Sequence, residues 1–196
     1  MFGRDISDEE LLTSIKEQVS KLPDEFSKVI GLLSFSKENN ISLMWSHYAD
    51  EHKGFVIGFE STIFQHNQPY SELTEVNYSK ERPLYSNSGN KNAAFKQLEE
   101  LLFTKSINWE YEQEIRSVVR LEHSNKPIKL ENSNYLCYLF NFPAESIKEI
   151  IVGWKMPLSE REKIWRIISD KYHQVKLFEA KPSESTFDLD ILPITE

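Results

Sequence analysis

The chain contains one cysteine, Cys137, among its 196 residues. A single thiol cannot form an internal disulfide and suits a reducing compartment, so the sequence predicts a cytoplasmic protein. No apolar run approaches the roughly 18 residues that a membrane-spanning helix needs. The N-terminus turns acidic at once and has no apolar signal region. These features exclude a disulfide scaffold and predict that no helix spans a membrane.

Positive charge is scarce relative to negative charge. The net charge is -8, and the lysines and arginines are dispersed along the chain. Binding to nucleic-acid phosphates is therefore disfavoured over most of the surface, although a locally basic groove is compatible with this charge. The six glycines are scattered and form no phosphate-cradling loop. We expect a small molecule or a protein as partner, rather than a nucleic acid.

The length and the apolar pattern predict one α+β domain. We expect an N-terminal helical segment over 1–26 and the domain over 27–196. Helical spacing of apolar residues predicts helices over 8–21, 42–52, 93–105 and 159–172. Short apolar or alternating runs predict strands near 29–36, 55–60, 75–79, 114–121, 149–152, 175–180 and 187–193. Strands alternate with helices but also occur in pairs, which favours a mixed or mostly antiparallel sheet with packed helices.

Two short polar and aromatic clusters stand out. The first, 44–54, reads MWSHYADEHKG, and the second, 109–116, reads WEYEQEIR. An ordinary core does not need this mixture, because burying a charge is costly unless the charge finds a partner. We therefore expect the two clusters to converge on one partly hydrated hollow, as small-ligand pockets do.

The first cluster makes the chain resemble the bacterial family DUF2971, a domain of unknown function. The resemblance continues through Val76-Asn77-Tyr78, Lys105, the second cluster and Ile150-Ile151-Val152-Gly153, over roughly 27–194. The family pattern also includes an N-terminal segment with an Arg- or His-bearing first strand and an Asn-Asp-Pro-Phe stretch, which this chain does not carry. A naturally short member, a misannotated start and a fragment all fit that difference.

A Ser-x-Ser and a Glu-x-Glu suggest a transferase. Ser34-Phe35-Ser36 ends a predicted strand, and Glu112-Gln113-Glu114 enters a later one. This order is similar to the ADP-ribosyltransferases of the Arg, Ser-x-Ser, Glu-x-Glu class, although the Arg has no clear counterpart here. The similarity implies NAD as substrate, a fold like theirs, and a role such as toxin or phage-defence effector.

The same similarity implies roles for individual residues. Glu114 would stabilise positive charge developing on the ribose, and Glu112 would orient or deprotonate the acceptor. The expected NAD-binding residues come from both clusters and from the first strand; they are Ser34, Ser36, Trp45, His47, Tyr48, Tyr111 and Arg116. Either Tyr48 or Tyr111 would stack on the nicotinamide.

Two other functions remain open. In a metal-dependent hydrolase, His47, Asp50 and Glu51 would share one helical face, but the spacing is not that of a zinc-protease helix, and we assign no metal ligand. In a non-catalytic ligand-binding or protein-interaction module, Trp45 and Tyr48 would belong to the core. Glu112, Glu114 and Arg116 would then form ion pairs.

Overall fold

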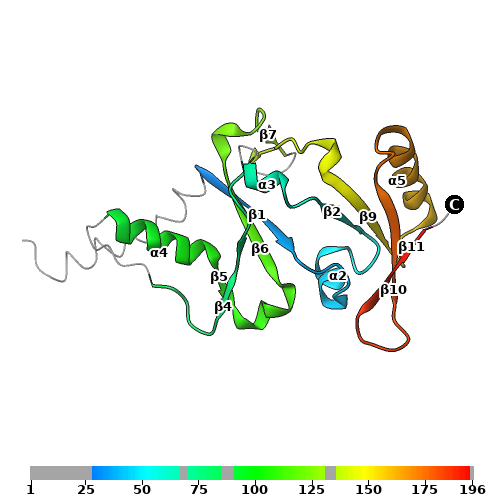
Figure 1. Cartoon of the computed structure of the whole chain (residues 1–196), viewed down its shortest axis with the longest axis horizontal. Coiled ribbons are helices and arrows are strands. Elements are labelled where there is room, and N and C mark those ends of the chain that lie inside the picture. Colours follow the sequence, from blue (N-terminus) through cyan, green and yellow to red (C-terminus); the bar gives the residue numbers. More distant parts are fainter. Residues whose placement is uncertain (1–27, 67–69, 85–90, 131–135, 195–196) are drawn as a thin grey trace, which may run out of the picture.

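The computed structural model describes residues 28–66, 70–84, 91–130 and 136–194, and Figure 1 shows their arrangement. The helix predicted over 8–21 lies outside these ranges. The division into a segment 1–26 and a domain 27–196 therefore stays a prediction. The described part is elongated, with the helices α4 (Lys91–Phe103) and α5 (Leu158–Lys171) at opposite ends.

The larger sheet contains four strands in the order β11-β10-β9-β2. Its strands β2 (Phe55–Phe59), β9 (Ile147–Gly153), β10 (Lys176–Pro182) and β11 (Leu189–Pro193) match the predicted ones closely. β9 and β10 run parallel, whereas the other two pairs are antiparallel. Because parallel neighbours need a crossover connection, α5 joins β9 to β10.

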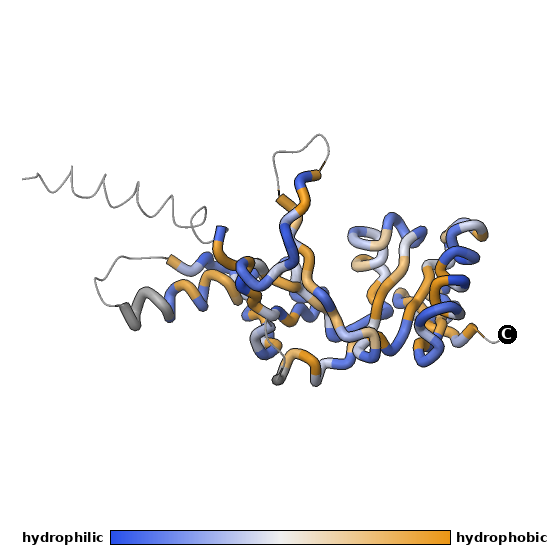
Figure 2. Tube along the Cα trace, turned by 90° about the horizontal axis from the view of Figure 1, so that it is seen from above, coloured by the Kyte–Doolittle hydropathy of each residue, from blue (hydrophilic) through white to orange (hydrophobic). Residues whose placement is uncertain are grey.

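Strand β9 is buried on both faces. Ile151 packs with Trp45 and Ala180 on one face, and Ile150 packs with Ile168 of α5 on the other. Figure 2 shows α5 alternating between hydrophilic and hydrophobic stretches, as expected for a helix that covers one face of a sheet. This double burial explains why residues 150–152 of β9 form a continuous apolar run.

The second main sheet contains three antiparallel strands in the order β1-β6-β3, namely β1 (Ile30–Ser36), β6 (Glu114–Arg120) and β3 (Thr74–Glu75). Between it and β2 lie the short helix α3 (Ile63–His66) and an aromatic cluster that includes Phe35, Phe59 and Phe64. Two small pairs complete the strands: β4 (Asn77–Ser79) with β5 (Thr104–Ser106), and β7 (Ile128–Lys129) with β8 (Leu136–Cys137).

The α+β class with mixed and antiparallel pairing is confirmed, with four α-helices in the described ranges. The expectation of one sheet is wrong, since the six main strands divide between two sheets. The strand expected over 75–79 is also split, because β3 pairs with β6 whereas β4 pairs with β5. Local periodicity reports which residues are buried, but it does not report which strands pair.

The helix predicted over 42–52 ends early. Helix α2 spans Ser42–Tyr48, and three residues after it have positive φ angles: 46° at Asp50, 51° at Glu51 and 69° at His52. Such angles are uncommon outside glycine, so the surrounding contacts have to hold them. The predicted end of the helix at residue 52 is therefore wrong.

Packing against the end of β9 explains this early end. The carbonyl of His52 accepts a hydrogen bond from the Lys155 amide, and Gly54 accepts one from the Gly153 amide at 3.0 Å. A Cβ atom on Gly153 would lie 2.0 Å from the His52 oxygen, so only glycine fits there. These tertiary contacts override the helical pattern of the sequence. None of the helices in the described ranges is long and apolar enough to cross a membrane.

Candidate functional site

A buried charge cluster lies where the 3-10 helix η1 (Ile107–Glu112) meets β6. The side chains of Glu112 and Glu114 are only 4% and 6% exposed. Between them Gln113 has a φ of 45°, the left-handed conformation in which η1 ends. Both carboxylates reach the ammonium of Lys105 from this turn.

Two cations balance these two carboxylates. Lys105 Nζ donates to Glu112 and, at 2.8 Å, to Glu114 Oε2. Arg116 donates to both oxygens of Glu114, through Nε at 2.7 Å and Nη2 at 3.1 Å, and also to the carbonyl of Leu102. The cluster is therefore neutral as a whole, which is the condition under which buried charges are tolerated.

These contacts shift the protonation equilibria. Burial alone raises the pKa of Glu114, but hydrogen bonds from Arg116, Lys105 and Ser34 outweigh it and bring the pKa to about 2. Burial lowers the pKa of Lys105, yet the hydrogen bonds to Glu112 and Glu114 outweigh it and the pKa is raised. Glu114 and Lys105 therefore stay charged throughout the physiological range.

Tyr48 joins the two sequence clusters. Its hydroxyl donates to Glu112 Oε1 at 2.8 Å, so the end of α2 touches the end of η1. Burial, followed by the hydrogen bond to Glu112, raises the pKa of the Tyr48 phenol. The ring itself is 63% exposed and remains accessible to a ligand.

The two serines of β1 lie beside the two glutamates. In the β1–β6 register Ser36 pairs with Glu114 and Ser34 pairs with Arg116. The Ser36 hydroxyl donates to the Glu112 carbonyl at 2.8 Å, and the Ser34 hydroxyl donates to the Glu114 carboxylate. The antiparallel pairing thus places Ser-x-Ser against Glu-x-Glu, although the two motifs are far apart in sequence.

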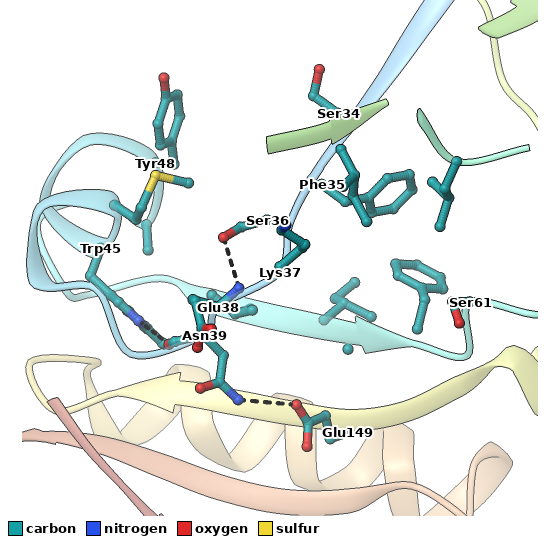
Figure 3. Close-up of a pocket in the computed structure, with 18 of the residues that line it drawn as sticks. Ser34, Phe35, Ser36, Lys37, Glu38, Asn39, Trp45, Tyr48, Ser61 and Glu149 are labelled. Carbon is teal, nitrogen blue, oxygen red and sulfur yellow. Dashed lines mark hydrogen bonds between the residues drawn. The ribbon is translucent and has the colours of Figure 1, made fainter. Parts of the chain in front are cut away.

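A cavity of about 490 Å³ opens between the two main sheets, beside this cluster. Its wall contains residues of β1, β2 and α2, among them Ser34, Ser36 and Tyr48, and Figure 3 shows several of them around the hollow. Trp45 donates its indole N–H to the Asn39 carbonyl at 2.7 Å in the same wall. The two carboxylates lie behind the wall, since neither Glu112 nor Glu114 lines the cavity.

The remaining predicted residues occupy different surroundings. Trp45 is 2% exposed and belongs to the core, with only part of it bordering the cavity. His47 is exposed, and its ring centroid lies 6.0 Å from that of Trp109. The ring centroid of Tyr111 also lies 6.0 Å from that of Trp109, and Tyr111 does not line the cavity. The rings of His47, Trp109 and Tyr111 therefore form a second, aromatic side of the charge cluster.

Two members of the cluster have no role in the sequence analysis. Lys105 is the shared cation of both glutamates, and the Tyr78 hydroxyl accepts a hydrogen bond from the Glu114 amide at 2.8 Å. Both residues were recognised only as part of the family resemblance. A count of charges in the second cluster would have indicated that a further cation is needed, because the cluster contains three glutamates and only one arginine.

The described part of the structure does not contain the helical face on which the metal-dependent hydrolase hypothesis depends. Glu51 lies beyond the end of α2, so it cannot share a helical face with His47. Within the described ranges, no group of three or more His, Cys, Asp or Glu side chains could hold a metal ion.

No curated protein and no solved structure matches this chain. A family model matches residues 44–117, a range that begins in α2 and ends in β6. The match thus covers Tyr48, Lys105, both glutamates and Arg116, whereas β1 and the last three strands of the larger sheet lie outside it. Over residues 44–117 the chain is thus similar to the family described as protein of unknown function (DUF2971).

Proposed function

We propose that the protein is an enzyme similar to ADP-ribosyltransferases, which binds NAD in the cavity between the two sheets. The main support is the pairing of Ser36 with Glu114, together with the hydrogen bond from Ser36 to the Glu112 carbonyl. This pairing brings together the two motifs that carry the similarity. A cavity of about 490 Å³ is also of the size that small-molecule ligands occupy.

The proposed reaction breaks the bond between ribose C1′ and the nicotinamide nitrogen of NAD. The electron pair of that bond stays on the nitrogen, and nicotinamide leaves. A lone pair of the acceptor forms the new bond to C1′, and the acceptor loses its proton to Glu112. The permanently ionised Glu114 stabilises the positive charge that develops on the ribose. The exposed ring of Tyr48 offers a stacking surface for nicotinamide.

The proposal requires a rearrangement in the carboxylate cluster. Lys105 and Arg116 occupy the oxygens of Glu114, and their positive charge opposes its stabilisation of a cationic ribose. NAD carries a pyrophosphate, which is a strong partner for such cations. We propose that bound pyrophosphate draws Lys105 and Arg116 towards itself, which releases Glu112 from Lys105 and Glu114 from both cations.

Nicotinamide release tests the proposal. We expect Glu112→Gln and Glu114→Gln to lower the rate of release from NAD by about 10²–10³-fold. Calorimetry should show that both variants still bind NAD. Glu110→Gln is the matched control, because Glu110 is exposed on the same 3-10 helix and should leave the rate unchanged. A purified chain that neither binds NAD nor releases nicotinamide contradicts the proposal.

A second candidate is a non-catalytic module that binds its ligand in the same cavity. The saturation of Glu114 by Lys105 and Arg116 favours it, because such a carboxylate already has a structural task. In this case Tyr48→Ala and Ser36→Ala weaken ligand binding, while no variant changes any turnover. Binding without nicotinamide release in the unaltered chain would select this second candidate.

A further inference from the structure

A second groove, which Lys105 lines, shares no lining residue with the cavity described above. It has a volume of about 590 Å³ and begins at the carboxyl ends of β4 and β5. These strands are parallel, and Ser79 pairs with Ser106 at their ends, so the chain leaves both strands at one edge. The lining consists of the segment 79–83, Leu101, residues 104–106 and Trp109.

The groove combines exposed cations with an exposed indole. Lys80 and Arg82 are exposed, and neither makes an ion pair or a hydrogen bond within the part of the chain that the structure describes. Trp109 is 37% exposed, and its indole N–H donates to none of the described residues. By contrast, Lys37 in the wall of the first cavity already pairs with the Glu75 carboxylate.

This combination has a specific binding chemistry. An exposed indole stacks on flat aromatic rings, and unpaired Lys and Arg side chains attract phosphate. Lys105 lies under the indole, with its ammonium 5.2 Å from the ring centroid, so the ring position is supported from behind. The volume lies within the range of small-ligand sites.

We infer that this groove binds a nucleoside phosphate, with its base stacked on Trp109 and its phosphates at Lys80 and Arg82. A mononucleotide fits better than a nucleic-acid strand, because Glu81 also lines the groove and the chain carries a net charge of -8. The inference does not depend on the proposed NAD reaction, since Ser34, Ser36 and Tyr48 do not line this groove.

Calorimetric titration with ATP, adenosine and inorganic pyrophosphate tests the inference. We expect ATP to bind more tightly than either adenosine or pyrophosphate, because only ATP offers both the base and the phosphates. The double variant Lys80→Ala/Arg82→Ala should lose about fivefold to tenfold in ATP affinity. Trp109→Ala should lose at least about fivefold, and Trp109→Phe should retain most of the affinity because it keeps an aromatic ring.

Two controls locate the binding. Lys163→Ala removes an exposed lysine from the remote helix α5 and should not change ATP affinity. Met44→Ala changes a side chain that lines the first cavity and not this groove, so it should leave ATP binding unchanged. Circular dichroism and the melting temperature confirm that each variant is folded.

Three outcomes overturn the inference: adenosine that binds as tightly as ATP, an undiminished ATP affinity in Lys80→Ala/Arg82→Ala, or binding of single-stranded oligonucleotides without binding of ATP. Failure of the NAD proposal has a different signature. If Lys80→Ala/Arg82→Ala abolishes NAD binding while Tyr48→Ala leaves it intact, NAD occupies this groove and the cavity between the sheets is not its site.

Discussion

Two glutamates of this protein are each held between an arginine and a lysine, yet their surroundings differ. Glu179 on β10 pairs with Arg161 at 2.6 Å and with Lys181 at 2.8 Å. Glu114 pairs with Arg116 and Lys105 at similar distances. In both cases burial raises the pKa of the carboxyl and hydrogen bonds from the two cations outweigh it, so that the pKa is lowered.

The difference lies in what else the cations hold. Arg161 also donates hydrogen bonds to the Gly153 and Trp154 carbonyls, and these bonds connect α5 to the end of β9. Lys105 instead holds a second buried carboxylate, Glu112, which in turn accepts the Tyr48 hydroxyl beside a cavity. An arginine–glutamate–lysine set is therefore a structural clamp in one place. In the other, the added carboxylate and the cavity make it a candidate site.

We expect the largest difference in stability between the two ion-pair clusters when Lys105 is replaced. Lys105→Met leaves Glu112 and Glu114 buried near each other without their shared cation, so we expect a loss of about 3–5 kcal/mol in the free energy of unfolding. Lys181→Met is the matched change at the other cluster. Because Lys181 is 51% exposed, we expect less than about 1 kcal/mol there. Urea denaturation measures both, and equal losses would contradict the distinction.

Acidification should reveal how much the ion pairs of Glu114 contribute to stability. A pKa of about 2 for Glu114, instead of 4.5, corresponds to roughly 3 kcal/mol of stability at neutral pH. A depressed pKa stabilises the fold above the pKa of the unfolded chain, so this contribution disappears as the pH falls from about 5 to 2. Glu114→Gln should lower the stability at pH 7 and flatten its decline with acid, as followed by urea denaturation at each pH. A parallel decline in the variant and the unaltered chain would contradict this.

The clamp on β10 should respond more weakly. In Arg161→Met, Glu179 keeps Lys181, and the Gly153 and Trp154 carbonyls lose a donor. We expect a loss of about 1–3 kcal/mol, smaller than that of Arg116→Met, because Glu114 is more deeply buried than Glu179. Thermal and urea unfolding of the two variants provide the comparison. NAD or ATP binding should not change in Arg161→Met.

The smallest stability effect is expected at Tyr48. Tyr48→Phe removes only one hydrogen bond from a ring that is 63% exposed, so we expect a loss below about 1 kcal/mol. The variant keeps the ring and should therefore keep any stacked ligand, whereas Tyr48→Ala should weaken NAD binding. Calorimetry with NAD on both variants distinguishes the hydroxyl from the ring.

Strand and helix positions followed largely from local pattern. Ile150 and Val152 lie on one face of β9 and Ile151 on the other, and such a run of apolar residues is easily recognised. Residues after Tyr48 were misjudged, because the contacts of His52 and Gly54 with Gly153 come from a distant part of the chain. The division into two sheets was missed for the same reason, because the sequence of an apolar strand does not indicate which strand pairs with it.

The candidate site shows the same division. The residue types of the two clusters, with carboxylates beside aromatic rings, were visible in the sequence and predicted a polar site. Lys105 was not assigned to it, because its place between Glu112 and Glu114 depends on how η1 turns into β6 through Gln113.

Local composition and periodicity thus established the class of fold, most of the elements and the chemical character of the two clusters, because these depend on neighbours within a few turns. The division into two sheets, the opposition of Ser36 and Glu114, and the shared lysine arose only on folding. Each of these requires segments that are distant along the chain to meet at hydrogen-bonding distance, and no local pattern encodes that distance.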